Sequence, residues 1–116
     1  MEKNMKLITA IIRPQQFSDV KEALEREGVR GLTVSDVAGY GCQHGHAEVY
    51  RGVRQTSQLV QKIRLDLVVR NTEADAMVDA IVQAAHTGNV GDGKVWVLPI
   101  DSVTRVRTGE SDAAAL

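Results

Sequence analysis

The sequence predicts an α+β fold of the ferredoxin-like type, with two helices on one face of an antiparallel four-stranded sheet. Two observations lead to this prediction. The order strand, helix, strand occurs twice along the chain, which makes a duplicated βαβ unit. The chain has 116 residues, enough for one hydrophobic core but not for two. We therefore expect a single domain over residues 1–116.

The first unit begins with a strand that is apolar on both faces. Residues 6–13 predict a buried strand, and Pro14 is expected to end it. Ser18 is expected to cap a helix that Gly28 closes, and residues 32–38 predict a second strand. Helical spacing identifies the core positions of this helix as Val20, Ala23 and Leu24.

The second unit repeats this order. Apolar residues alternate with mostly polar ones over residues 62–69, which is typical of a half-buried strand. Thr72 is expected to cap the second helix and Gly88 to end it. A fourth strand is predicted over residues 94–100 and a short fifth over residues 103–107. The apolar stripe of the second helix consists of Met77, Ile81, Ala84 and Ala85.

The two helices can cover only one face of the predicted sheet. In the first strand, Ile8 and Ile12 alternate with Leu7 and Ile11, so both faces of that strand are apolar. The second face then needs a partner chain, and self-association is the simplest way to cover it.

Composition excludes several classes of function. The formal net charge of −1 gives no basic field for nucleic acid, and no apolar run approaches the roughly 20 residues of a membrane span. With one cysteine, Cys42, the chain cannot form an internal disulfide. No signal peptide is recognised at its start, so we expect a cytoplasmic protein without nucleic-acid partners or direct membrane insertion.

Residues 87–94, Thr-Gly-Asn-Val-Gly-Asp-Gly-Lys, form the most informative motif. Its three glycines allow main-chain N–H groups to approach an anion closely, and Lys94 adds a positive charge. The segment fits G-x-x-x-x-G-K, but Val95 replaces the Ser/Thr of a P-loop, and the segment runs from a helix into a strand. A plain glycine-rich turn is the alternative; we favour anion contact.

Three further cations are candidates for the same site. Arg105 and Arg107 alternate and would share one face of an extended strand, as a phosphate clamp or as guards of a sheet edge. Lys62 stands where the long segment 39–61 closes, and it either meets an acid held there or extends into solvent.

The long segment 39–61 is expected to be functional. Cys42, His44 and His46 could bind a metal, although tetrahedral sites normally draw on separated segments. No nucleophile–base set and no paired carboxylates are evident, so we do not expect an enzyme.

Three motifs together resemble the P-II nitrogen-regulatory signal-transduction family: Tyr50-Arg51-Gly52, the glycine motif, and Arg105-x-Arg107-Thr108-Gly109-Glu110. The similarity runs from about Met5 to Leu116. It implies a homotrimer whose nucleotide sites lie in the clefts between subunits. It also implies a T-loop at about residues 39–61, a B-loop at about 87–94 and a C-loop at about 103–116, the last contributed across the subunit boundary.

The resemblance implies that ATP and ADP, and possibly AMP, compete for one site, with Mg²⁺ accompanying ATP and a second effector, 2-oxoglutarate, beside them. One subunit would supply Thr33, residues 66–68 and residues 91–94, and the next would supply the two arginines. The implied nucleotide contacts are Thr33, Cys42, Asp66, Leu67, Val68, Thr87, Gly91, Asp92, Gly93, Lys94, Arg105 and Arg107. The implied 2-oxoglutarate contacts are Gly41, Gln43, His44, Gly45, Lys62 and Gly91, with Gln43 also reaching Mg²⁺.

The resemblance further implies a regulated partner, such as an ammonium channel or a metabolic enzyme, that binds Tyr50, Arg51 and Gly52. Gln55 and Val53 stand at the family's nucleotidylylation and phosphorylation positions, so neither modification is expected there. Cys42 replaces an arginine near the ATP phosphates. Two alternatives therefore stay open: a specialised paralogue that senses ADP or AMP with another small anion such as bicarbonate, and a weak ATP hydrolase.

Overall fold

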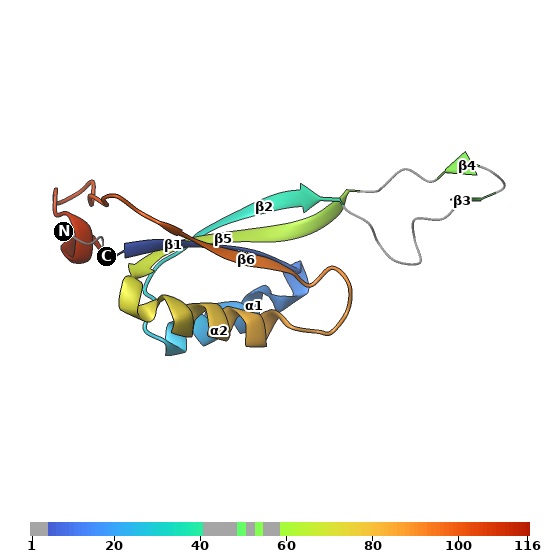
Figure 1. Cartoon of the computed structure of the whole chain (residues 1–116), viewed down its shortest axis with the longest axis horizontal. Coiled ribbons are helices and arrows are strands. Elements are labelled where there is room, and N and C mark those ends of the chain that lie inside the picture. The colour runs from blue at the N-terminus through green and yellow to red at the C-terminus, as the bar shows by residue number, and fades with distance from the viewer. Residues whose placement is uncertain (1–4, 41–48, 51–52, 55–58) are drawn as a thin grey trace.

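A computed structural model describes residues 5–40, 49–50, 53–54 and 59–116. A four-stranded sheet forms one layer and two helices form the other, as Figure 1 shows. The sheet consists of β1 (Met5–Ile12), β2 (Thr33–Gly39), β5 (Val60–Arg70) and β6 (Gly93–Pro99). The helices are α1 (Phe17–Arg26) and α2 (Ala74–Ala85). The predicted α+β architecture is thus confirmed.

The strands follow the order β2-β5-β1-β6, and every neighbouring pair is antiparallel. The first βαβ unit contributes β1 and β2, and the second contributes β5 and β6. The strands β1 and β5 occupy the centre of the sheet, and β2 and β6 form its edges. Register places Thr9 of β1 between Asp66 of β5 and Trp96 of β6.

The core lies between the sheet and the helices. The buried positions of the helices include the predicted Val20, Ala23, Leu24, Met77, Ile81 and Ala85, while Ala84 is only partly buried. Alternate residues of the central strands complete the core: Ile8, Ala10, Ile12, Leu65, Leu67 and Val69. The strict alternation over residues 62–69 therefore identified the face of β5 that meets the helices.

The predicted helix caps are wrong. Helix α1 follows a 3₁₀ turn that starts at Pro14, so Ser18 already lies inside the helix. Helix α2 likewise follows a 3₁₀ turn, Asn71–Glu73, in which the Glu73 carboxylate accepts a hydrogen bond from the Arg70 main-chain N–H at 3.2 Å. Proline and glutamate thus start the helices one turn earlier than the hydroxyl residues would.

The helix ends agree only in part with the sequence prediction. Gly28 has a φ of 98°, and its N–H donates to the Glu25 carbonyl, as expected of a glycine that closes a helix. Helix α2 instead ends at Ala85 and leaves through His86 in an extended conformation, before Gly88 is reached. None of the helices in the described ranges is long and apolar enough to cross a membrane.

The long segment between β2 and β5 contains a short ladder that the sequence did not predict. Strand β3 (Val49–Tyr50) pairs antiparallel with β4 (Val53–Arg54). Strands β2 and β5 extend to Gly39 and Val60, so both ends of the predicted segment 39–61 belong to the sheet.

The sheet face away from the helices carries both apolar and polar side chains. Register places Leu7, Ile11, Trp96 and Leu98 on this open face. Trp96 and Leu98 are 39% and 50% exposed, whereas Thr9 at its centre is completely buried. The predicted second apolar face of the first strand is thus present at Leu7 and Ile11, with the polar Thr9 between them.

Candidate functional site

A glycine-rich turn connects α2 to β6 at one end of the sheet (Figure 1). Gly88, Gly91 and Gly93 have φ values of 89°, 102° and 106°. A Cβ atom at Gly93 would overlap the main-chain carbonyl oxygen of Ile11. The predicted anion-binding motif is therefore a turn that requires glycine at three positions.

The carboxylate of Asp92 lies inside this turn. Its Oδ2 accepts hydrogen bonds from the main-chain N–H groups of Thr87 at 2.7 Å and Gly88 at 2.9 Å. Its Oδ1 accepts from the Thr87 hydroxyl and from Arg13 Nε, the latter at 2.9 Å. The Thr87 hydroxyl and amide, with Arg13, hold the pKa of Asp92 far below its usual range. Asp92 and the Thr87 hydroxyl thus face their own turn.

Two cations lie against the turn from the central strands. Lys62 Nζ donates to the carbonyl of Gly91, and Arg13 Nη2 donates to the carbonyl of Val90 at 2.7 Å. Burial, and then the positive charge of Arg13, lower the pKa of Lys62. Lys62 is therefore partly buried and directed at the turn, and does not extend into solvent.

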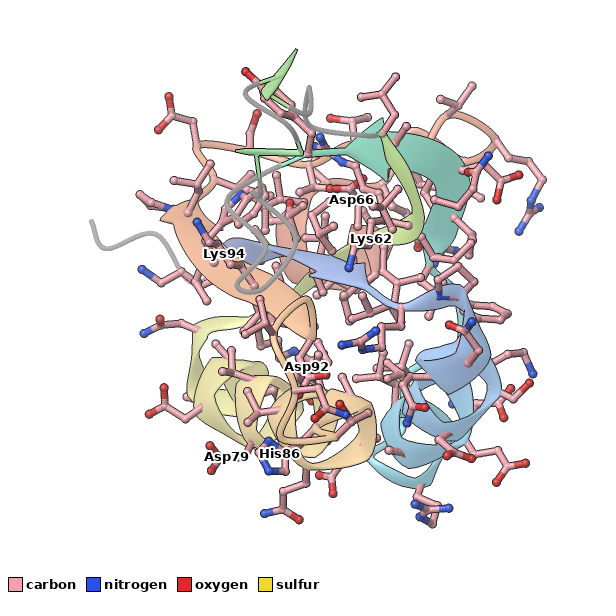
Figure 2. All side chains as sticks on the ribbon, turned by 90° about the vertical axis from the view of Figure 1, so that its right-hand side faces the viewer. Lys62, Asp66, Asp79, His86, Asp92 and Lys94 are labelled. Carbon is pink, nitrogen blue, oxygen red and sulfur yellow. The ribbon has the colours of Figure 1, made fainter. Side chains whose placement is uncertain are left out.

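A hollow of about 420 Å³ opens beside the turn; we call it the turn hollow. Figure 2 views the molecule from this end, where Lys62, Asp92 and Lys94 gather around the turn. The hollow combines two ammonium groups with two aromatic rings, and its lining consists of Ile11, Gly39, Tyr40, Val60, Lys62, Val90, Gly91, Gly93, Lys94 and Trp96. Gly91, Gly93, Lys94 and Lys62 were predicted; Arg13, Tyr40 and Trp96 were not.

Arg105 and Arg107 lie in a turn, and the predicted fifth strand is wrong. The main-chain N–H of Arg105 donates to the Glu110 carbonyl at 2.8 Å, and the Gly109 N–H donates to the Arg105 carbonyl at 2.8 Å. Gly109, with a φ of 75°, allows this reversal. The two guanidinium groups therefore do not share one face of a strand.

The side chain of Arg105 is held by the segment that follows it. Arg105 Nη1 lies 3.3 Å from Glu110 Oε1, and Nη2 donates to the main-chain oxygen of Leu116 at 2.8 Å. Leu116 in turn lines a second hollow of about 340 Å³, which we call the C-terminal hollow. Its lining consists of Gly28, Val29, Arg30, Gly31, Val68, Val69, Arg70, Glu73, Met77, Ala113 and Leu116.

The two hollows lie at opposite ends of the sheet. The C-terminal segment follows the end of β6, where the Ile100 N–H donates to the Met5 carbonyl, whereas the glycine turn precedes β6 at its other end (Figure 1). One chain therefore brings Lys62 to the glycine turn but does not bring Arg105 there.

Thr33, Asp66 and Leu67 also lie apart from the turn. Thr33 is on the edge strand β2, three strands from β6 and hence about 14 Å away. Both carboxylate oxygens of Asp66 already accept hydrogen bonds, from Thr9 at 2.7 Å and Arg64 at 2.9 Å. The side chain of Leu67 is buried in the core, so only its main chain could contact a ligand.

Several predicted residues lie outside the described residues: Gly41, Cys42, Gln43, His44, Gly45, Arg51, Gly52 and Gln55. Tyr50 belongs to β3. The alternative metal ligands Cys42, His44 and His46 also fall outside. Within the described ranges, no three or more His, Cys, Asp or Glu residues are grouped so as to hold a metal ion.

Comparison with known proteins places the chain in a family. The model of the family "Nitrogen regulatory protein P-II" matches residues 5–110. Nitrogen regulatory protein GlnK of Escherichia coli K12 is 46% identical over 112 residues, which cover 97% of this chain and 100% of that protein. Nitrogen regulatory protein P-II of Synechocystis is 47% identical, with the same coverage. Both names denote regulators, which counts against a weak ATP hydrolase.

A solved structure extends the comparison. The crystal structure of Arabidopsis thaliana PII bound to citrate is similar, with a TM-score of 0.82 and 35% sequence identity. The similarity covers 99% of this chain and 94% of that one. The chain thus belongs to the P-II family of nitrogen regulatory proteins.

Proposed function

We propose that this non-catalytic P-II regulator binds ATP or ADP between copies of the chain in a homotrimer. A small carboxylate, 2-oxoglutarate, would bind beside Lys62, and Mg²⁺ would accompany ATP through Gln43. The occupied site would set the shape of the T-loop and thereby control a cytoplasmic partner, such as an ammonium channel or a metabolic enzyme. A ligand can shift the loop only through different affinities for its states.

The separation of the cations within one chain carries this proposal. Lys62 and Lys94 line the turn hollow, and Arg105 lies beside the C-terminal hollow at the other end of the sheet. Lys94 and Arg105 can contact one polyphosphate, with Lys62 beside it for the carboxylate, if the turn hollow of one copy meets the C-terminal hollow of the next. Such a head-to-tail contact closes into a ring when three copies are related by a threefold rotation, which is the homotrimer that the family resemblance implies.

The chemistry of the turn hollow fits a phosphorylated ligand with a flat apolar part. Main-chain N–H groups of a glycine turn and the ammonium group of Lys94 suit phosphate. Trp96, 39% exposed, offers an aromatic surface for a base. In this arrangement one subunit supplies Thr33, Val68 and Arg105, and the next subunit supplies residues 91–94. The family resemblance had instead grouped Thr33 and residues 66–68 with residues 91–94.

Mixing two variants tests the intersubunit site. Lys94→Ala and Arg105→Ala should each weaken ADP binding about tenfold or more, since each removes a charge-assisted contact. After co-refolding in equal amounts, about a quarter of the clefts should combine an intact Lys94 with an intact Arg105 from a neighbouring copy. Calorimetry should then recover a high-affinity fraction that neither variant shows alone. Recovery of none would place both residues in one chain's site and overturn the proposal.

The specialised paralogue is the second candidate, because Cys42 stands where the family resemblance implies an arginine. A neutral thiol supplies fewer donors to the outer phosphates, so ADP should bind at least as tightly as ATP. Titrations with ATP, ADP and AMP, each with and without 2-oxoglutarate or bicarbonate, distinguish the candidates. Cys42→Arg should shift the preference toward ATP; a wild-type preference for ATP that this variant leaves unchanged would reject the second candidate.

A further inference from the structure

The glycine turn is held in shape from inside, before any ligand is bound. Both carboxylate oxygens of Asp92 accept hydrogen bonds from Thr87, Gly88 and Arg13. Only 22% of its side chain is exposed. A carboxylate that faced the ligand would repel a phosphate, but four donors surround this charge and direct it into the turn.

The guanidinium of Arg13 joins the turn to the end of β1 at two points. Its Nε donates to Asp92 at 2.9 Å, and its Nη2 donates to the carbonyl of Val90 at 2.7 Å. A Cβ atom at Gly91 would lie 3.2 Å from Arg13 Nη2 and 3.5 Å from Lys62 Nζ, so both cations pack closely against the turn.

The direction of two successive peptide groups follows from these contacts. The carbonyl of Val90 is held by Arg13, and the carbonyl of Gly91 is held by Lys62. In a planar trans peptide the N–H points opposite to the C=O. The N–H groups of Gly91 and Asp92 must therefore point away from Arg13 and Lys62. Neither of these two side chains contacts those N–H groups.

We infer that Asp92 and Arg13 are positioning residues, which fix the turn so that its N–H groups are already arranged for a phosphate. This inference rests on the proposed nucleotide site and deepens it. Asp92 acts through Thr87, Gly88 and Arg13, and it does not contact the nucleotide. Preorganisation of this kind raises affinity because the ligand does not bear the cost of ordering the turn.

A direct role of Asp92 as a ligand of Mg²⁺ would leave a different signature. Carboxylates commonly hold the Mg²⁺ that accompanies nucleotide phosphates. Loss of a metal ligand would weaken binding of the magnesium complex only. Loss of a positioning residue would weaken ADP binding equally with Mg²⁺ and with EDTA.

The experiment titrates ADP into wild type, Asp92→Asn, Arg13→Lys and the double variant, in Mg²⁺ and in EDTA. Fluorescence of Trp96, the one tryptophan of the chain, and calorimetry report binding. Asp79→Asn is the control, since it removes an exposed carboxylate from α2 (Figure 2). We expect Asp92→Asn to lose about tenfold in affinity in both solutions, with amide exchange of Thr87 and Gly88 accelerated in the ligand-free protein.

Arg13→Lys keeps the charge but cannot make both hydrogen bonds of the guanidinium, so it should weaken binding too. The double variant should lose less than the sum of the two single losses, because the two residues share the Arg13–Asp92 contact. Additive losses, an effect confined to Mg²⁺, or affinity of Asp92→Asn within twofold of wild type would overturn the assignment. Wild-type protein that binds no adenine nucleotide would overturn the proposed function and the assignment together.

Discussion

The Thr9 hydroxyl donates a 2.7 Å hydrogen bond to Asp66 Oδ1 across the two central strands of the sheet. Arg64 Nε donates to the other carboxylate oxygen at 2.9 Å. This network occupies the centre of the open face, and Thr9 is completely buried there. Its polar groups are paired within one chain, so a second copy that covers the face meets satisfied groups and not unpaired charges.

Thr9→Val should destabilise the fold by removing the donor while keeping the shape of the side chain. A hydrogen bond to a charged group contributes about 1.5–3 kcal/mol. Asp66 keeps its contact with Arg64, and 24% of its side chain is exposed, so we expect the lower end of that range. Urea unfolding at fixed protein concentration measures the loss, with the exposed Thr72→Val as the control. Equal stability of both variants would show that the Thr9 bond contributes nothing.

The pKa of Asp66 predicts how stability changes in acid. The hydrogen bond from Arg64, more than that from Thr9, lowers the pKa of Asp66 in the folded protein. Below the usual Asp pKa of about 3.9, the unfolded chain then binds more protons than the folded one, and stability falls with pH. Asp66→Asn should be less stable than wild type above about pH 5, and the gap should narrow toward lower pH.

Urea unfolding at a series of pH values tests this prediction, with Asp75→Asn as the control for loss of an exposed carboxylate on α2. Asp92 also has a lowered pKa, so the acid limb of Asp66→Asn should become shallower without vanishing. Parallel curves for wild type and Asp66→Asn would contradict the assignment of this carboxylate.

Leu98→Glu should disrupt the oligomer and spare the protomer. Leu98 faces the open side of the sheet and is 50% exposed in one copy, so a charge there costs the isolated fold little. A charge that a partner copy buries without a counter-charge loses its hydration, which destabilises the oligomer. Light scattering should show a smaller particle than for Val82→Glu, a control on α2 that is 47% exposed. A trimer that tolerates Leu98→Glu would place the subunit contact elsewhere.

The sequence predicted the fold because its strongest signals are periodic. Alternation over residues 62–69 and helical spacing in α1 identified the core positions correctly. The first and last residues of the helices and strands were less predictable. Ser18 and Thr72 are good capping residues, but a 3₁₀ turn precedes each helix. Pro14 starts the first turn, and the Glu73 carboxylate accepts a hydrogen bond from Arg70 at the second. Propensity alone does not rank these two solutions.

The residues of the glycine turn were expected to lie together, but the sequence did not show how the cations are arranged around that turn. The glycines and the lysine of residues 87–94 predicted an anion site, and Gly91, Gly93 and Lys94 line the turn hollow. Arg13 was missed because it follows β1 and stands 79 residues before Asp92, and nothing local in the sequence links the two. The pair Arg105 and Arg107 suggested a strand by its spacing, whereas Gly109 turns the chain just beyond it.

Comparing Gly93→Ala with Gly109→Ala separates the cost of a steric clash from the cost of a left-handed backbone conformation. Both glycines have positive φ, 106° and 75°. At Gly109 nothing lies within 4 Å of an added Cβ, so the substitution should cost only the left-handed backbone penalty of about 1–2 kcal/mol. At Gly93 the Cβ would overlap the Ile11 carbonyl oxygen and lie 2.8 Å from its carbon. Because that carbonyl belongs to the central strand β1, the backbone cannot shift without disturbing the sheet. We therefore expect the free energy of unfolding to fall by about 3 kcal/mol or more.

Unfolding in urea compares the two variants directly. Gly93→Ala should also displace the glycine turn from Lys62 and weaken ADP binding by more than the tenfold expected for loss of one contact. Gly109→Ala changes the other end of the molecule and leaves the glycine turn in place. Equal losses of stability in the two variants would mean that β6 moves away from β1 without cost at Gly93. The turn would then be adjustable, and its glycines would serve the backbone conformation alone.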